Sequence, residues 1–392
     1  MIAYQIKDDV YWVGAVDWNL RSFHGYSTDQ GTTYNAYLIL DEKVTLVDNV
    51  KAHFSNEMLA RIASIIDPGK IDVIISNHGE PDHSGSLTEV LALAPKAKVY
   101  SSNPNGVKIL KAIYGEMPIV PVKTNDTISI GKRTLKFIQT PMVHWPDNMV
   151  TYCPEDKILY SNDIFGQHYA TSRLFDGDND LETIIREAKK YYSNIVLPYT
   201  KQAKKAVAAL DGLNIAMIAT SHGVIWKNHL SAIMALYNDL VNSKKRNKAV
   251  VVYDSMWGNT ETMARVVTEA FMEKKINVRL YNVNETEDSD IITELADAKY
   301  VAVGASTLNN NMLPPIAAFL YYLKGLAPVD LKYIAFGSYG WGGQSIKQIA
   351  DLLEEMHYEP LISPVKLLYT PQPEDLMKMQ TAIINALNSE EQ

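Results

Sequence analysis

From Ala249 onward the chain alternates short apolar runs with helix-like segments at regular spacing. Parallel strands need a crossover between them, and a helix is the usual one, so this alternation favours strands that all run the same way. The apolar runs read "AVVVYDS", "VRLYNV", "YVAVGAS", "YIAFGSY" and "VKLLY". The pattern therefore predicts a doubly wound parallel sheet with helices on both faces.

The first 240 residues follow another pattern, in which short apolar strands such as "VTLVD", "DVIIS" and "LKFIQT" are separated by helical stretches such as "FSNEMLARIASII". A polar, basic stretch, "NSKKRNK" (242–248), lies between the two patterns and is typical of a linker. A chain of 392 residues also exceeds the usual size of one domain. We therefore expect two α/β domains, 1–246 and 247–392.

The net charge of -8 gives no reason to expect nucleic acid or an anionic membrane as a partner. The start of the chain lacks a basic segment followed by an apolar run, and no stretch reaches the roughly 20 apolar residues that span a bilayer. We therefore expect a cytoplasmic protein. The single cysteine, Cys153, excludes an intrachain disulfide and a four-cysteine iron site, and its strand context predicts an ordinary buried residue.

In the second domain, "SMWGNTETMARVV" places Gly258 where a strand turns into a helix. Backbone N–H groups and the positive end of the helix dipole then point at an anion. The stretch has no Gly-Lys-Ser/Thr and no G-x-G-x-x-G, so it is neither a nucleoside triphosphate loop nor a dinucleotide fingerprint. Taken alone, it would also fit a capped helix start.

Two further loops, "GASTLNNNMLPP" (304–315) and "GSYGWGGQS" (337–345), follow strands whose C-terminal ends lie at the same edge, where doubly wound sheets bind ligands. Their glycines allow close backbone approach, and aromatic side chains can stack on a flat ring. Together the three loops resemble a flavodoxin domain that binds FMN. The resemblance implies these FMN contacts: Ser255, Met256, Trp257, Gly258, Asn259, Thr260, Ser306, Thr307, Leu308, Asn309, Asn310, Asn311, Ser338, Tyr339, Gly340, Trp341, Gly342 and Gly343.

In the first domain, the strand "IDVIISN" leads into "HGEPDHSGS", where four candidate ligands lie within six positions: His78, Glu80, Asp82 and His83. The nearby glycine and proline favour a loop rather than a helix. A lone histidine is more often structural than a ligand. Four metal-binding side chains this close together reverse that expectation and predict a metal site.

Three more candidate ligands each follow an apolar strand: His144, Asp163 and His222. Singly, each also fits a structural role, as a hydrogen-bonded histidine or a turn. All seven together resemble the metallo-β-lactamase superfamily in the order of their loops, but Glu80 stands where its hydrolases carry a histidine. The added carboxylate favours iron or manganese over zinc. With Asp163 as a bridge, the others form two sets of two histidines and one carboxylate: His78, Glu80 and His144, and Asp82, His83 and His222.

Two ferrous ions carry four positive charges, which three carboxylates and a bridging hydroxide neutralise, as a buried cluster requires where no further counter-charge is nearby. A lactamase-like diiron domain followed by a flavodoxin domain resembles the flavodiiron proteins along essentially the whole chain. Segments such as "GTTYNAYLI", "HWPD", "FGQHYATS" and "YGWGG" add to the resemblance. It implies an oxidoreductase with FMN and two iron ions that reduces dioxygen to water, nitric oxide to nitrous oxide, or both.

The resemblance also implies a homodimer, or a dimer of such dimers, with FMN of one subunit near the metals of the other. It places His24 and Tyr191 in the substrate pocket, with His168 as a weaker candidate nearby, although packing on a helix would also explain Tyr191. The chain has no rubredoxin-like cysteine pairs, so we expect an external electron donor, either rubredoxin or a reduced deazaflavin. The alternatives are a dizinc hydrolase of the lactamase fold and an electron carrier with an inert first domain.

Overall fold

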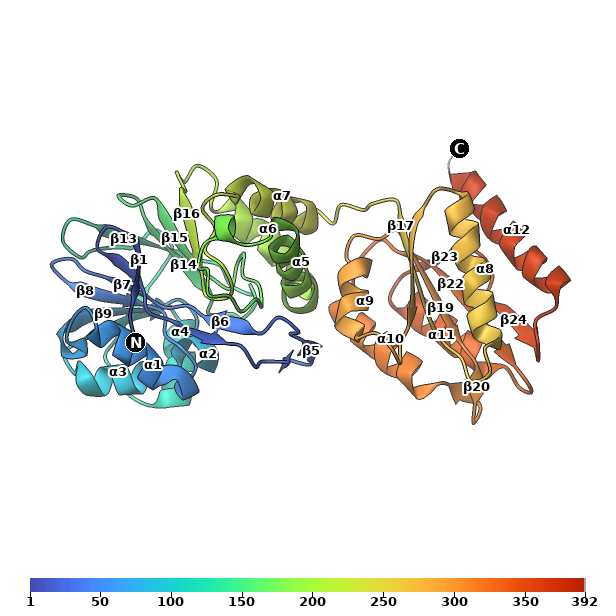
Figure 1. Ribbon diagram of the computed structural model, residues 1–392, viewed down its shortest axis with the longest axis horizontal. Helices are drawn as coiled ribbons and strands as arrows, with labels where there is room; N and C mark the ends of the chain where they lie inside the picture. Colours follow the sequence, from blue (N-terminus) through green and yellow to red (C-terminus); the bar gives the residue numbers. More distant parts are fainter. Residues whose placement is uncertain (391–392) are drawn as a thin grey trace. The chain divides into compact units, whose positions relative to one another are not determined.

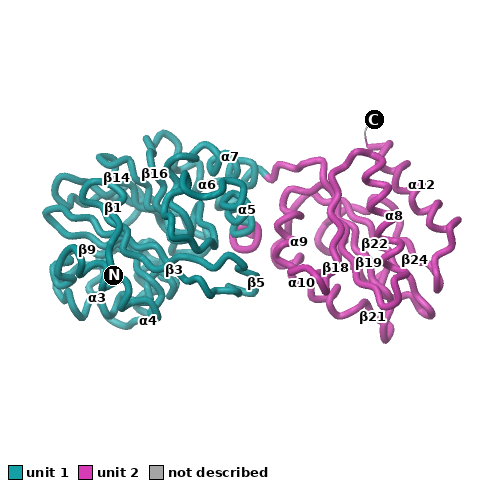
Figure 2. Tube along the Cα trace, viewed as in Figure 1, with its two compact units in different colours: residues 1–192, 199–242 teal, residues 193–198, 243–392 magenta. Residues whose placement is uncertain are grey.

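The computed structural model describes residues 1–390, which form two compact units (Figure 2). Unit 1 comprises Met1–Tyr192 and Tyr199–Asn242, and unit 2 comprises Ser193–Pro198 and the chain from Ser243 onward. The chain therefore passes between the units at three places. The domain boundary expected at 246/247 stays a prediction.

Unit 1 contains two large sheets (Figure 1). The first has seven strands in the order β1-β2-β7-β8-β9-β10-β11, and the second has five in the order β12-β13-β14-β15-β16. The strands of the first are β1 (Tyr4–Lys7), β2 (Val10–Trp12), β7 (Tyr37–Ile39), β8 (Val44–Val47), β9 (Ile71–Ser76), β10 (Lys98–Ser102) and β11 (Ile119–Val122). Those of the second are β12 (Thr127–Ser129), β13 (Thr134–Gln139), β14 (Met149–Cys153), β15 (Ile158–Asn162) and β16 (Met217–Thr220).

Shorter pieces complete unit 1. Two small antiparallel sheets pair β3 (Ala15–Asp17) with β6 (Thr32–Tyr34) and, as a hairpin, β4 (Ser22–Phe23) with β5 (Tyr26–Ser27). The α-helices are α1 (Ser55–Ala63), α2 (Pro81–Ser84), α3 (Leu87–Leu93), α4 (Asn105–Tyr114), α5 (Leu181–Tyr191), α6 (Thr200–Ala208) and α7 (Leu230–Val241). Single 3-10 turns are η1 (Ala52–Phe54), η2 (Pro68–Lys70), η3 (Asp176–Asp178) and η5 (Leu197–Tyr199), and η4 (Tyr192–Val196) is a π-turn.

The apolar side chains of unit 1 form two layers. One cluster, including Trp12, Ile75 and Phe137, joins the inner faces of the two sheets. The other, including Leu46 and Met58, packs the outer face of the seven-stranded sheet against helices. Two sheets packed face to face, with helices on the outer face of the first, agree with the expected metallo-β-lactamase-like sandwich. Both layers form because alternate residues of each strand face opposite sides.

Unit 2 has the doubly wound sheet expected from the sequence, in the order β18-β17-β19-β22-β23, with β24 also paired to β22. All of these pairs are parallel. The strands are β17 (Lys248–Asp254), β18 (Asn277–Asn282), β19 (Tyr300–Ala305), β22 (Lys332–Tyr339), β23 (Glu359–Pro360) and β24 (Val365–Leu368), and a separate hairpin joins β20 (Thr307–Leu308) to β21 (Asn311–Met312).

Helices cover both faces of this sheet. One apolar cluster, including Val251, packs it against α8 (Asn259–Glu273) and α12 (Pro373–Glu390). The opposite cluster, including Val250, packs it against α9 (Asp288–Leu295), α10 (Pro314–Leu326) and α11 (Gln344–Glu355). Val250 and Val251 are consecutive, and they enter opposite cores because side chains alternate across a strand.

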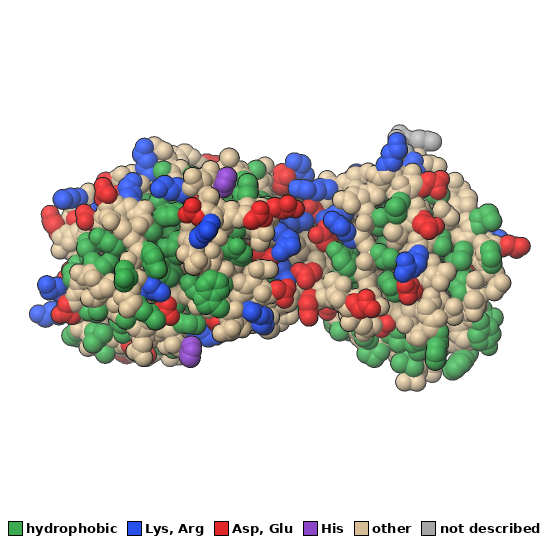
Figure 3. All heavy atoms as spheres, viewed as in Figure 1, with side chains coloured by type: hydrophobic (Ala, Val, Ile, Leu, Met, Phe, Trp, Pro, Cys, Tyr) green, Lys and Arg blue, Asp and Glu red, His purple; other side chains and the backbone are tan. Residues whose placement is uncertain are grey.

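Figure 3 shows basic and acidic side chains interspersed over the visible face of each unit. Among residues 1–390, we find no helix that combines the length and the apolar character needed to cross a membrane.

Candidate metal centre and cofactor pocket

Seven polar side chains gather where strands of both sheets of unit 1 end. Four of them follow β9, and the other three follow β13, β15 and β16. All seven are at most 8% exposed, and they fall into two groups of potential ligands. The seven are His78, Glu80, Asp82, His83, His144, Asp163 and His222.

The prediction of a loop at residues 78–86 was wrong at one point, because Pro81–Ser84 forms the single turn α2. The fixed φ of Pro81 suits the first position of a helix. Ser84 completes the turn, since its hydroxyl donates to the carbonyls of Gly79 and Glu80. The turn separates Glu80 from Asp82 and His83, so that Glu80 lies in one group and Asp82 and His83 lie in the other.

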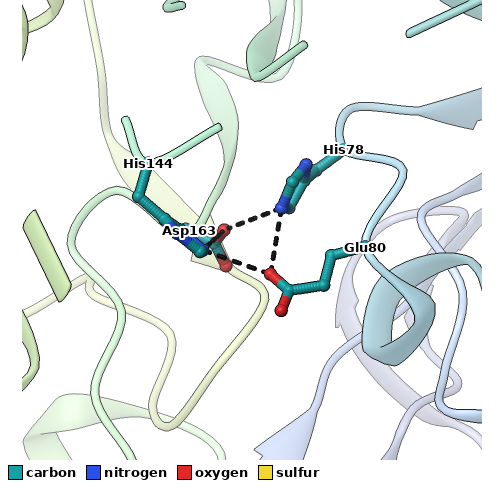
Figure 4. Close-up of side chains that lie close together, drawn as sticks. All are labelled: His78, Glu80, His144 and Asp163. Atoms are coloured by element: carbon teal, nitrogen blue, oxygen red, sulfur yellow. Dashed lines mark hydrogen bonds and ion pairs between the residues drawn. The ribbon is translucent and has the colours of Figure 1, made fainter. Parts of the chain in front are cut away.

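The first group consists of His78, Glu80, His144 and Asp163, whose polar atoms converge from three loops (Figure 4). Glu80 Oε2 lies 3.1 Å from His78 Nε2 and 3.2 Å from His144 Nε2. Asp163 Oδ2 lies 3.7 Å and 3.5 Å from the same two nitrogens. These four atoms surround one small space.

The second group consists of Asp82, His83 and His222. The two Asp82 oxygens each lie 3.3 Å from a histidine Nε2, one from His83 and the other from His222. Asp163 reaches this group too, because its Oδ1 lies 3.0 Å from His83 Nε2 and 3.8 Å from His222 Nε2. The two oxygens of Asp163 therefore face different groups.

These residues fit two metal ions. Ligand atoms about 2.1 Å from one ion lie about 3.0 to 3.4 Å from one another, close to the separations in both groups. Both oxygens of Asp82 and Oδ2 of Asp163 are buried without a hydrogen bond from any described residue. A buried carboxylate oxygen without a donor is costly, and a cation would remove that cost.

Two of the carboxylates are held in the ionised form that a metal ligand needs. Burial alone would raise the pKa of Glu80, but hydrogen bonds from His144, His24 and His78 bring it below its usual range. Burial likewise opposes ionisation of Asp163, yet the charge and hydrogen bond of His83 bring its pKa well below the usual value.

Neighbouring groups orient two of the histidines. His78 Nδ1 lies 3.1 Å from both oxygens of Asp147, and His222 Nδ1 lies 2.7 Å from the carbonyl oxygen of Thr33. In each case Nδ1 carries the proton and donates it, which leaves Nε2 free for a metal. Sequence reasoning missed the role of Asp147, although the segment "HWPD" that contains it was noted.

The candidate substrate-pocket residues lie beside the metal groups. His24, at the tip of the β4–β5 hairpin, places Nε2 2.5 Å from Glu80 Oε1, and this hydrogen bond raises its pKa. Tyr191 is 1% exposed, with its ring 5.1 Å from His168 and 5.9 Å from His222. Burial holds the pKa of His168 well below its usual value, and its Nδ1 lies 2.8 Å from Thr32 Oγ1.

Unit 2 has a pocket of about 230 Å³ at the C-terminal ends of its strands. Two of its tryptophans are unusually exposed for their size, Trp257 at 88% and Trp341 at 81%. Aromatic rings on a pocket rim can stack on a planar ligand. The lining residues are Met256, Trp257, Asn259, Ser306, Thr307, Ser338, Tyr339, Gly340, Trp341 and Tyr369.

Thr260, in the first of the three loops, is hydrogen-bonded to the other two. Its hydroxyl lies 3.1 Å from Ser306 Oγ and 3.2 Å from Ser338 Oγ. Ser255 Oγ is buried without a hydrogen bond from the described residues, as expected where a ligand oxygen would donate or accept. The exposed tryptophan rings suit a planar group, and the hydroxyls together with the N-terminus of α8 suit a phosphate. The pocket therefore fits a planar, phosphorylated cofactor.

Not every expected contact lines the pocket. Tyr369 lines it but was not foreseen, because it follows the edge strand β24 rather than a glycine-rich loop. The expected residues outside the lining, whose roles stay predictions, are Ser255, Gly258, Thr260, Leu308, Asn309, Asn310, Asn311, Gly342 and Gly343.

Comparisons with known proteins cover both units. Residues 32–223 match the ODP family beta lactamase model, and residues 251–379 match the flavodoxin model. The chain is 42% identical over 388 residues to the rubredoxin-oxygen oxidoreductase of Megalodesulfovibrio gigas, covering 97% of this chain and 96% of that one. It is 41% identical over 380 residues to the nitric oxide reductase of Moorella thermoacetica, covering 95% of each. The crystal structure of the flavodiiron protein from Giardia intestinalis matches with a TM-score of 0.95 at 34% identity, covering 100% of this chain and 98% of that chain.

Proposed function

This chain belongs to the flavodiiron protein family, and we propose that it reduces dioxygen to water, nitric oxide to nitrous oxide, or both. The observation that supports this best is the position of Asp163. Its two oxygens face separate groups of buried ligand atoms, in a chain that also carries a flavodoxin domain.

We propose two iron ions at these groups, held by the seven residues of the metal centre, and FMN in the pocket of unit 2. Each set of two histidines and one carboxylate, with Asp163 shared, is the ligand set of non-haem ferrous sites. When bound, two ferrous ions supply one electron each and reduced FMN supplies two.

The electron count fits both reactions. Reduction of one dioxygen to two waters consumes four electrons and four protons, which equals the electrons of two ferrous ions and one reduced flavin. Conversion of two nitric oxide molecules to nitrous oxide and one water consumes two electrons and two protons. The chain can therefore supply either reaction, and the choice between them depends on the surroundings of the metals.

The protein's own residues hold and orient the centre. His24 donates to the Glu80 oxygen that faces away from His78 and His144, which fixes the carboxylate plane. We propose that Tyr191, buried beside His222, supplies a hydroxyl to the substrate pocket.

We propose an external electron donor that reduces the FMN. The relative from Megalodesulfovibrio gigas is a rubredoxin-oxygen oxidoreductase, which supports rubredoxin as this donor, and a reduced deazaflavin stays the second candidate. A homodimer, or a dimer of dimers, is also part of the proposal. Sedimentation at decreasing protein concentration tests it, and a fully active monomer would contradict it.

The dizinc hydrolase is not supported, because relatives named as reductases match over at least 95% of this chain, including the flavodoxin domain. An inert first domain disagrees with the seven assembled ligands.

The test begins with metal and flavin analysis of anaerobically purified protein, followed by reoxidation of the reduced protein under dioxygen or nitric oxide. We expect two iron ions and one FMN per chain, with flavin reoxidation by at least one gas. Asp163→Asn should lose iron and reoxidation, whereas Asp178→Asn, an exposed carboxylate of η3, should retain both. Two zinc ions without flavin would contradict the proposal.

A further inference from the structure

His78 differs from the other histidines of the metal centre in what supports it. Its Nδ1 lies 3.1 Å from Asp147 Oδ1 and 3.1 Å from Asp147 Oδ2, so the carboxylate faces the ring with both oxygens. Both side chains are fully buried. A charge-assisted hydrogen bond in such a place is stronger than one to a neutral acceptor, because little water screens it.

Asp147 is itself held in place by the surrounding backbone. Its Oδ2 accepts from the backbone N–H of Gly79 at 2.6 Å, and its carbonyl oxygen accepts from Ser102 Oγ at 2.6 Å. The carboxylate therefore connects the loop that carries His144 to the loop that carries His78. Asp147 therefore holds the imidazole ring of His78 in place and also keeps the proton on its Nδ1.

Among residues 1–390, neither histidine of the second group has a carboxylate within hydrogen-bond distance of its Nδ1. His222 Nδ1 lies 2.7 Å from the neutral carbonyl oxygen of Thr33. His83 Nδ1 is buried and makes no hydrogen bond with the described residues. One group is thus backed by a full negative charge and the other by a backbone dipole.

We propose that Asp147 makes the two metal positions unequal. By adding negative charge behind His78, it strengthens His78 as a ligand, so the ion at His78, Glu80 and His144 binds more tightly and gives up its electron more readily. If reduced FMN passes one electron to each iron, the iron held by Asp82, His83 and His222 would be reduced before the iron held by His78, Glu80 and His144. This assignment rests on the proposed diiron centre but adds an order to it.

The test is an anaerobic titration of the metal-free protein with ferrous ion, together with a potentiometric titration of the loaded centre followed by electron paramagnetic resonance. The wild-type protein should bind the two ions in unequal steps, and the half-reduced centre should accumulate over a wide range of potential. In Asp147→Asn, which keeps an acceptor for His78 and Gly79, the tighter step should weaken about 10- to 100-fold. In the same variant, the range of potential over which the half-reduced centre accumulates should be narrower than in the wild-type protein.

Asp176→Asn serves as the matched control. Asp176 is also fully buried in unit 1, but its carboxylate accepts from the backbone N–H groups of Lys227, Asn228 and His229 rather than from a metal ligand. The control should leave both binding steps unchanged.

Two equal binding steps in the wild-type protein would overturn the inference without any variant. Equal weakening of both steps in Asp147→Asn would also overturn it. Each result is separable from failure of the proposed function, because a protein with two equal iron sites could still reduce dioxygen or nitric oxide.

Discussion

His24 and Glu80 share a 2.5 Å hydrogen bond between Nε2 and Oε1, while the other oxygen of Glu80 faces His78 and His144. One carboxylate thus connects a half-exposed histidine on a hairpin tip to a buried metal group. One oxygen of Glu80 accepts from His24 and the other faces the metal ligands. Substitution of His24 and substitution of Glu80 should therefore have distinguishable effects.

His24→Leu should reduce turnover about 10-fold or more, because Glu80 loses the donor that fixes its plane. Iron content should stay near two per chain, since His24 is not among the ligand groups. The measurement is turnover with dioxygen and with nitric oxide, each compared with iron content. His53→Leu, which removes an exposed histidine of η1, is the control. Unchanged turnover in His24→Leu would show that Glu80 keeps its orientation without this bond.

Glu80→His should change the metal preference toward zinc and abolish reductase activity, because it restores the ligand pattern of the hydrolases. Metal analysis after growth with both metals measures the change, and circular dichroism checks that the fold persists. Glu89→His, an exposed change on α3, should leave the metal content unaltered. Full iron-dependent activity in Glu80→His would contradict our account of the ligand set.

Thr260→Val should weaken FMN binding about tenfold, or about 1.4 kcal/mol, because three loops lose their shared hydroxyl. Recovery of flavin fluorescence on dilution measures the affinity. Thr268→Val is the control on the same helix. Among the described residues its hydroxyl donates to the carbonyl of Ala264 within α8, so its loss should have little effect on FMN affinity. Iron content should be the same in both variants. Equal FMN affinity in the two variants would exclude a role for Thr260 in shaping the pocket.

Cys153 should be unreactive toward thiol reagents in the native protein at pH 8. Burial raises the pKa of its thiol to about 12, so the reactive thiolate is scarce. After unfolding, one equivalent should react rapidly. The same shift affects stability: it is without effect below the unfolded thiol's pKa of about 8.5, and it reduces stability as the pH rises from there toward 12. Rapid labelling of the native protein would show that the thiol is accessible.

The sequence predicted the two folds and the metal ligands for a physical reason. Ligand residues such as His78 and Asp163 follow apolar strands directly, so the ends of the strands determine where they meet. The role of Asp147 could not be read in this way, because an acidic residue in a loop has many possible partners. Its contact with His78 depends on how two loops fold together.

Backbone detail was also beyond the sequence. Glycine and proline around residue 80 indicated a loop, yet Pro81 begins a helical turn that divides the ligands between two groups. The sequence did not predict that Ser193–Pro198 belongs to unit 2, because only "NSKKRNK" has the composition of a linker. His24 was expected in the substrate pocket, which stays a prediction, and its hydrogen bond to the carboxylate of Glu80 was not foreseen.

The ligands come from the ends of strands in both sheets of unit 1, with His78 following β9 in one sheet and Asp163 following β15 in the other. A pair of ions bound between these residues would cross-link the two sheets. Because each set of ligands comes from both sheets, metal binding and the packing of the two sheets would be coupled. Ions bound to the folded unit would raise its free energy of unfolding, and their loss would weaken the contact between the two sheets at this edge.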